Sequence, residues 1–313
     1  MKNKSFLIIK KQPQLVILAA VLLVFTFAIP KFATAGNLMN VLKTASVMAF
    51  ACIGLSVVLI GGNLDLSIGS QLSCLCVISM TMQRVSPVLG ILVPVAVSVG
   101  FGVMNGVLVY RFKINSIVVT LGTMSVLEGL ALLPSNAMSV QGLPGTWFSN
   151  IAGIMLGPMP VYVIYFIVLA AGMQFILTKS KFGRGLYYLG SNPEAARTAG
   201  HDVGRTTTLS FVICSLCISL SAIVQSSRMM TANPVGGTGL EFEALTALLI
   251  GGISLTGGRG NIVQAVTGVL LLTLIVNGMN LVGAAYEYQL MAKGILIIVA
   301  IVADAVVRYR DGK

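Results

Sequence analysis

The sequence predicts an all-α, polytopic membrane protein with about ten transmembrane helices in a single domain, residues 1–313. Hydrophobic residues make up 56% of the chain and charged residues only 9%, whereas a soluble domain carries about 25% charged residues. Long uncharged runs alternate with short polar segments that hold most of the charges. Because a helix needs about 20 mainly apolar residues to cross the hydrocarbon layer, these runs are candidate membrane spans.

Ten apolar runs approach this length. The first could be mistaken for a secretion signal, because Lys10 and Lys11 precede it and Ala33-Thr34-Ala35 has the form of a cleavage site. It is longer than most signal cores and a second long run follows, so we expect it to be retained. The eighth run is short for a full span. The ten runs are Leu15–Pro30, Val41–Ile60, Leu64–Met82, Val88–Tyr110, Ile117–Leu133, Val161–Leu177, Thr207–Ser227, Phe242–Leu255, Ile262–Leu281 and Leu290–Val307.

The distribution of basic residues predicts the orientation. Lys and Arg gather in the cytoplasmic loops of membrane proteins. With a cytoplasmic N-terminus, the ten spans place 15 of the 20 basic residues inside and leave outside only Lys31, Lys43, Arg84, Arg228 and Lys293. Both termini are therefore expected in the cytoplasm, with long loops on the outside at about residues 134–160 and 229–243.

Several classes of function are disfavoured by what the sequence lacks. The net charge of +11 lies in short basic clusters without interleaved aromatics, so no nucleic-acid partner is expected. The chain contains no G-x-x-x-x-G-K-[ST] phosphate loop and no visible nucleophile, base and acid set, so it is not expected to be an enzyme. The five cysteines lie within apolar runs, where a thiol behaves as a small hydrophobe, and we expect neither a disulfide framework nor a metal site.

One of the few long polar runs, residues 189–205, is expected to contain a short surface helix. Asn192 can cap the first turn, Pro193 suits the first helical position, and Glu194 lies where the helix dipole favours negative charge. Gly200 is a natural stop.

The alanines of this segment suggest a role for it. Ala195, Ala196 and Ala199 leave one side of the helix almost without side chains, so another protein could approach its backbone closely. This is the profile of a docking element, although an ordinary capped helix between two membrane spans would look the same. The only histidine, His201, lies just past the helix, where a solvated or interface role is expected.

Two glycine-rich breaks share their opening letters: LIGGNLDLSIGS at Leu59–Ser70 and LIGGISLTGGRG at Leu249–Gly260. Glycine clusters interrupt helices, and corresponding interruptions in two halves of a chain point to a transport pathway. Chance similarity, or glycine turns between tightly packed helices, would give the same letters.

Polar residues in or beside the spans are costly in lipid and are candidates for a transport pathway. Glu128 is the most expensive of them, and either carries a proton in transport or pairs with a neighbouring helix. The pathway candidates are Asn63, Asp65, Asn105, Thr123, Asn277 and Asn280. The two outer loops are either a surface for an external partner or plain connectors.

Four long motifs resemble the membrane permease of ribose-type ABC sugar importers, and together they extend over nearly the whole chain. They are NLDLSIGS (Asn63–Ser70), LGSNPEAARTAG (Leu189–Gly200), PVGGTGLEFEALTALLIGGISLTGGRG (Pro234–Gly260) and NGMNLVGAAYEYQLMAKG (Asn277–Gly294). The resemblance implies the ribose/branched-chain-type ABC permease architecture in a bacterial inner membrane.

The resemblance also implies partners and assigns the short helix. Two permeases, forming a homodimer or a heterodimer, would work with a cytoplasmic ATPase that binds ATP and Mg²⁺ and with a periplasmic sugar-binding protein. This chain itself would hold no cofactor and would contact only membrane lipid besides these partners. The loop at about 179–206 resembles one that carries a coupling helix docked on the ATPase. The coupling-helix residues are Asn192, Pro193, Glu194, Ala195, Ala196, Arg197 and Gly200.

Three departures from the family pattern bear on the substrate. Relatives commonly have glycine, isoleucine and aspartate where this chain has Gly62-Asn63-Leu64-Asp65, an aspartate often stands at Glu243, and His201 replaces an aliphatic residue. The family resembles carriers of ribose, other pentoses, hexoses and a furanone-related signal molecule, so the sugar stays open. The alternative from another class is a gradient-driven secondary transporter that uses Glu128 or Asp65 as its coupling acid.

Overall fold

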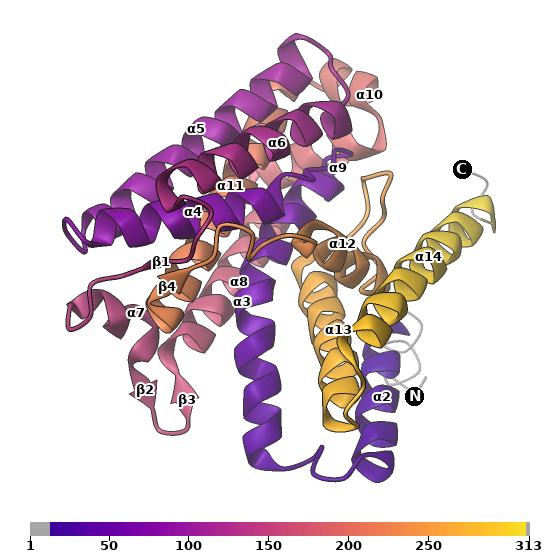
Figure 1. Ribbon diagram of the computed structural model, residues 1–313. Coiled ribbons are helices and arrows are strands. Elements are labelled where there is room, and N and C mark those ends of the chain that lie inside the picture. The colour runs from indigo at the N-terminus through magenta and orange to yellow at the C-terminus, as the bar shows by residue number, and fades with distance from the viewer. Residues whose placement is uncertain (1–12, 311–313) are drawn as a thin grey trace.

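The computed structural model describes residues 13–310, and these residues are mainly α-helical (Figure 1). The only strands among them are four of two residues each, paired β1 with β4 and β2 with β3. The elements are α2 (Pro13–Ala28), α3 (Ala35–Ile60), α4 (Ile68–Gln83), α5 (Leu89–Arg111), α6 (Ser116–Ser135), β1 (Val140–Gln141), η1 (Trp147–Ser149), α7 (Asn150–Gly153), β2 (Met155–Leu156), β3 (Met159–Pro160), α8 (Val161–Lys179), α9 (Lys181–Ser191), α10 (Pro193–Thr198), α11 (Val203–Met229), β4 (Thr231–Ala232), α12 (Leu240–Ile250), α13 (Ile262–Leu281) and α14 (Tyr286–Arg310).

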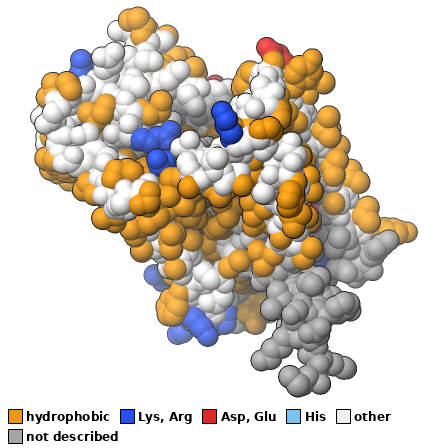
Figure 2. All heavy atoms as spheres, turned by 90° about the horizontal axis from the view of Figure 1, so that it is seen from below, with side chains coloured by type: hydrophobic (Ala, Val, Ile, Leu, Met, Phe, Trp, Pro, Cys, Tyr) orange, Lys and Arg blue, Asp and Glu red, His pale blue; other side chains and the backbone are white. Residues whose placement is uncertain are grey.

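Seven of the described helices are long and apolar enough to cross a membrane: α3, α5, α6, α8, α11, α13 and α14. The other three expected spans correspond to the shorter helices α2, α4 and α12, so the count of about ten spans stays a prediction. Figure 2 shows hydrophobic side chains over much of the face seen from below, with basic side chains in a few separate groups. The chain is therefore a multi-pass membrane protein.

Two of the shorter helices differ from the apolar runs that predicted them. The third run begins at Leu64, but α4 begins at Ile68, because the amides of Leu64 and Leu66 donate to hydroxyls of α6 instead of entering a helix. The eighth run ends at Leu255, but α12 has only 11 residues and ends at Ile250. At 1.5 Å per residue, α12 is about 17 Å long and cannot cross a bilayer by itself.

The centre of the fold is formed by α3 and α11, which are mostly buried, whereas α14 is almost entirely exposed on this chain. Helix α11 packs along α5, α3 and α4, and α13 packs against α3, α12 and α2 (Figure 1). Helix α14 packs mainly on α12. One large cluster of buried apolar side chains from most of these helices forms the core.

The two glycine-rich breaks end their helices in the same way. After α3, Gly62 adopts a left-handed φ of 79°, and after α12, Gly252 adopts a φ of 92°. In each case the following amide, that of Asn63 or Ile253, donates to the carbonyl five residues earlier, at 3.1 and 3.0 Å. Both turns therefore close as glycine-dependent helix caps, and the shared letters correspond to a shared local structure.

The two breaks also meet in space, together with the end of α9. The Gly258 amide donates to the Ile60 carbonyl at 2.8 Å, and Gly190 lies against both groups. A Cβ atom on Gly257 would come within 2.6 Å of the Gly62 Cα and 3.0 Å of the Gly190 Cα. We call Gly62, Gly190, Gly257 and Gly258 the glycine junction. It joins three segments that are far apart in sequence.

The loops separate into two groups, as alternate crossing of a membrane requires. In one group, β1 pairs with β4, and the Gln83 side chain bonds the amide and carbonyl of Leu143 at 2.7 and 3.0 Å. The Ser227 hydroxyl donates to the Phe148 carbonyl at 2.7 Å. These are the loops expected outside. The glycine junction lies in the other group, although which group faces the cytoplasm stays a prediction.

The Gly190→Ala substitution tests the glycine junction. A Cβ at Gly190 would lie 1.9 Å from the Ile60 carbonyl oxygen and 2.4 Å from the Gly258 nitrogen, so backbone would have to move. We expect a loss of roughly 1–3 kcal/mol or more, seen as a lower melting temperature in detergent. The control is Gly172→Ala in α8, where a Cβ meets nothing within 4 Å. Equal melting temperatures for the two variants would contradict the tight junction.

Candidate functional site

The capped helix expected from the sequence is α10, and its ends are formed as predicted. The Asn192 side-chain oxygen accepts hydrogen bonds from the amides of Glu194 and Ala195, at 3.0 and 3.1 Å. Pro193 is the first helical residue, and Gly200 has a φ of 81°, which ends the helix. The helix has only six residues, so its geometry is set largely by these caps.

The exposure of α10 corrects one expectation about its alanines. Ala195 and Ala199 are exposed, but Ala196 is buried and packs toward the rest of the chain. The surface open to another protein therefore includes Ala195 and Ala199 without Ala196. Asn192, Pro193, Glu194, Arg197 and Gly200 are also exposed.

Helix α9, directly before α10, was not expected from the sequence. The Ser180 hydroxyl accepts from the Gly183 amide at 3.0 Å and caps its first turn. Phe182, Leu186 and Leu189 recur at helical spacing and turn inward, which was the signal that could have predicted an amphipathic helix.

Two further contacts fix α9 and the segment that follows α10. The Tyr187 hydroxyl donates to the Gly260 carbonyl at 2.7 Å, and burial raises the pKa of Tyr187, so it stays a donor at neutral pH. The His201 ring lies 5.2 Å from the Tyr188 ring, between centroids, so His201 packs within this segment. Helices α9 and α10 thus form one unit on the glycine junction.

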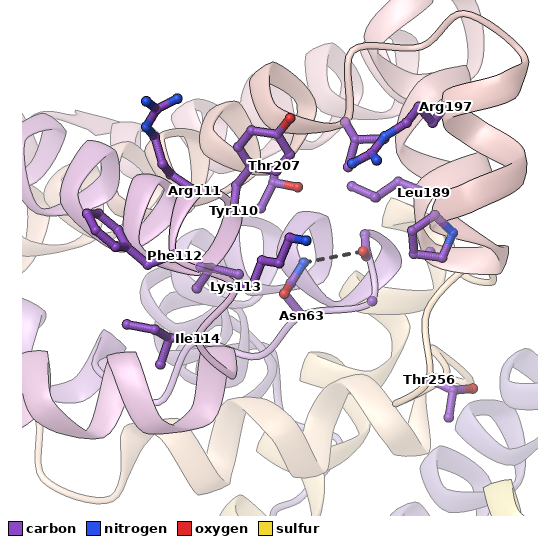
Figure 3. A pocket seen from close by; sticks show the side chains of 16 residues that line it. Asn63, Tyr110, Arg111, Phe112, Lys113, Ile114, Leu189, Arg197, Thr207 and Thr256 are labelled. Carbon is purple, nitrogen blue, oxygen red and sulfur yellow. Dashed lines mark hydrogen bonds between the residues drawn. The ribbon is translucent and has the colours of Figure 1, made fainter.

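A cavity of about 790 Å³ opens beside this unit, between the end of α5, the first glycine break, α10 and the start of α11 (Figure 3). Its basic lining residues are Arg111, Lys113 and Arg197, and none of the lining residues within 13–310 is Asp or Glu. Of the pathway candidates, only Asn63 lies here, with its amide nitrogen 3.4 Å from the Gly61 carbonyl. The other candidates lie elsewhere.

Asp65 lies at the start of α4 and is fully buried. One carboxylate oxygen accepts from the amide and the hydroxyl of Ser67, while the other has no partner among the described residues. Gln71 donates to the Ser67 hydroxyl at 2.8 Å. Asp65 therefore shapes the extended segment before α4.

Asn105 and Thr123 form a buried contact between α5 and α6. The Thr123 hydroxyl donates to the Asn105 side-chain oxygen at 2.6 Å. This pairing satisfies two polar groups inside the helix bundle and holds the two helices together. It supports a structural role for both residues.

The last two pathway candidates lie together on α13. Asn277 exchanges two hydrogen bonds of 2.9 Å with Asn37 of α3, and Asn280 accepts from Gln289 of α14 at 2.8 Å. Both asparagines line a cavity of about 130 Å³ that also includes Glu243 and Lys293. The structure thus brings Asn277 and Asn280 together and keeps them apart from Asn63.

The segment at about 229–243, which is expected to be an outer loop, includes helical residues at both ends. Met229 is the last residue of α11, while Glu241 and Glu243 lie in the first turn of α12. Glu241 is buried and accepts from the Gly239 amide at 3.2 Å, and Glu243 pairs with Lys293 of α14. Acidic side chains favour the first turn of a helix, which explains why the two glutamates start α12 instead of ending the loop.

Glu243 also borders a second cavity, of about 250 Å³, with Thr44, Gln225 and Arg228. Thr44 borders both this cavity and the one at Asn277. Hydroxyl, amide and charged groups of both signs line this space, so it can donate to and accept from hydroxyl groups of a small polar molecule. Sequence reasoning missed it because its residues come from α3, α4, α11, α12 and the loop before α12. Within residues 13–310, no cluster of three metal-ligating side chains occurs.

A double-mutant cycle measures the ion pair between α12 and α14. Lys293→Gln and Glu243→Gln should each lower the melting temperature, because the remaining partner is left without its counter-charge beside apolar helices. The double variant should lose less than the sum, with a coupling of about 0.5–3 kcal/mol. Lys293→Gln combined with Glu194→Gln on α10 should be additive. Additivity in both pairs would mean that the contact contributes nothing.

Comparison with known proteins supplies the family. Residues 37–301 match the family described as branched-chain amino acid transport system / permease component. The ribose import permease protein RbsC of Escherichia coli (strain K12) is 31% identical over 304 residues, which cover 94% of this chain and 93% of that protein. RbsC of Bacillus subtilis (strain 168) is 33% identical, covering 88% and 86%.

A relative named for another sugar matches equally well. The D-allose transport system permease protein AlsC of Escherichia coli (strain K12) is 32% identical, covering 93% of this chain and 90% of that protein. No solved structure matches the chain.

Proposed function

Because this chain belongs to the family of branched-chain amino acid transport system permease components, we propose that it is the transmembrane subunit of an ABC importer for a monosaccharide. The relatives named above are permeases for ribose and D-allose and match nearly the whole chain. The proposed cargo is a ribose-like pentose, a hexose or a related sugar-derived molecule. It moves from the periplasm to the cytoplasm.

The proposed assembly supplies the energy from other chains. Two permeases, identical or different, span the bacterial inner membrane with their termini in the cytoplasm. A cytoplasmic ATPase binds and hydrolyses Mg-ATP, and a periplasmic binding protein delivers the sugar. The family is one of transport permeases, and this chain's part is to change shape.

The observation that carries the proposal is that α10 is exposed and is held in place by α9 and the glycine junction. Its two caps fix a short helix whose Glu194, Ala195 and Ala199 side chains are open to a partner. Helix α9 connects α10 to the glycine junction, where Gly190 touches the break after α3 and the loop after α12. A displacement of α10 by the ATPase therefore reaches both breaks through backbone contacts.

The two cavity regions fit alternating access. The space at Thr44, Gln225 and Glu243 offers hydrogen-bonding groups to a sugar, while the cavity at Asn63 lies beside α10. Transport needs each state to open one region and close the other, so the ATPase must contact α10 differently in the two states. The separation of Asn63 from Asn277 and Asn280 fits two ends of one route.

The gradient-driven alternative makes Glu128 or Asp65 a coupling acid. Glu128 is exposed on α6, and one of its oxygens accepts from the Ser70 hydroxyl at 3.1 Å. The hydrogen bond links Glu128 of α6 to Ser70 of α4. It favours a role for Glu128 in holding two helices together over a role in proton coupling. The choice between the two functions rests on the energy source, and that is measurable.

The docking variant is Glu194→Arg combined with Ala195→Trp. Both side chains are exposed, so we expect the chain to fold but to lose copurification with its ATPase and most ATP-driven uptake. Ala196 is avoided because it is buried, and a tryptophan there would disturb folding. Copurification from membranes and uptake into proteoliposomes are the measurements.

The matched control is Glu287→Arg combined with Ala33→Trp. These exposed positions carry the same two changes, and Glu287 also lies in the first turn of a helix. Both residues are expected on the outer side and should leave ATPase binding unchanged. If the docking variant binds and transports like this control, α10 is only a loop helix.

Glu128→Gln separates the two transport mechanisms. The amide keeps the size of the side chain and can still accept from Ser70, so an ABC permease should retain ATP-driven uptake within about twofold. A proton-coupled carrier that uses Glu128 as its coupling acid would lose uptake driven by a pH gradient. Gradient-driven uptake by the wild type without ATP, abolished in Glu128→Gln, would replace the importer proposal.

A further inference from the structure

We propose that the basic cavity beside α10 binds the phosphate-bearing headgroup of an anionic phospholipid. Arg111, Lys113 and Arg197 line it, and no acidic side chain of the described part of the chain does. Among the described residues, none of the three basic side chains forms an ion pair. Three unpaired cations around a cavity of about 790 Å³ favour an anionic occupant by charge complementarity.

Two of the basic side chains point into the cavity from different walls (Figure 3). Lys113 extends from the α5–α6 connection toward Asn63, and Arg197 extends from α10 on the opposite wall. Arg111 points away from them in this view and contributes mainly to the local positive field. Thr207 of α11 adds a hydroxyl to the same wall. An anion between Lys113 and Arg197 would bridge the end of α5 to α10.

The surroundings of Lys113 favour a lipid over a soluble ligand. Phe112 and Ile114, the two sequence neighbours of Lys113, are 64% and 40% exposed, and Val118 in the first turn of α6 is 62% exposed. Apolar side chains next to a lysine at the end of a membrane helix are suited to acyl chains, with the lysine at headgroup level. Basic pockets between membrane helices on the cytoplasmic side bind acidic headgroups. The predicted orientation puts this cavity on that side.

The position of the cavity means that a bound lipid would affect α10. Arg197 is carried by α10, whereas Lys113 is carried by the connection after α5. A headgroup held by both would restrain α10 relative to the helix bundle, and its binding would be sensitive to any displacement of α10. The inference needs only the purified chain, so it stands or falls separately from the ATPase proposal.

The test is binding of fluorescent phosphatidylglycerol to the purified full chain in neutral detergent, with Lys113→Gln combined with Arg197→Gln. Removing two basic groups should weaken binding roughly tenfold or more. The matched control is Lys179→Gln combined with Lys181→Gln, which removes the same charge from exposed positions on the same predicted side but outside the cavity. The control should stay within about twofold of the wild type.

Competition identifies the source of the phosphate. Unlabelled phosphatidylglycerol should displace the probe, while neutral phosphatidylcholine and inorganic phosphate at the same concentration should not. Equal loss in the two double variants would reduce the effect to general surface charge and overturn the site. Displacement by inorganic phosphate alone would assign the cavity to a soluble anion and overturn the lipid. Unchanged lipid binding together with lost ATPase copurification in Lys113→Gln with Arg197→Gln would make the cavity part of a protein interface.

Discussion

The close backbone contact at the glycine junction is the constraint on which the arrangement of this end of the helix bundle depends. Gly190 approaches the Ile60 carbonyl and the Gly258 amide so closely that no side chain fits there. The hydrogen bond from Gly258 to Ile60 satisfies the carbonyl of the last residue of α3 and an amide of the loop after α12. Because the Ile60 carbonyl is buried, separating the three segments would leave a buried polar group without its partner, at a cost in free energy.

The same requirement explains the polar residues inside the bundle. Asn105 with Thr123 and Asn37 with Asn277 pair across neighbouring helices, and each pair satisfies groups that lipid cannot. Such pairs hold helices in register at a modest gain, since alternatives also exist in the unfolded chain within the membrane. Polarity within a span is thus a mark of helix pairing at least as much as of a route for cargo.

The sequence was informative where a feature is local. The cap at Asn192, the stop at Gly200 and the similarity of the two glycine breaks depend on neighbouring residues, and all three are present. The inward turn of Ala196 and the meeting of Glu243 with Lys293 depend on how distant helices pack, and no local pattern encodes them. The apolar spacing of α9 could have predicted a helix. Because Lys181 and Arg184 are charged, the segment was instead assigned to the polar loop between two spans.

Helix α10 depends on both kinds of constraint, the local caps and the packing against distant segments. Its own six residues cannot hold a helix in water, because isolated helices of that length are marginal even in favourable sequences. It persists because Asn192 caps one end, Ala196 packs inward and α9 ties it to the glycine junction. A force on α10 therefore acts on a braced element and not on a flexible loop. Through Gly190 it reaches the end of α3 and the loop after α12 together, so the docking proposed for α10 would bias both halves of the bundle at the same time.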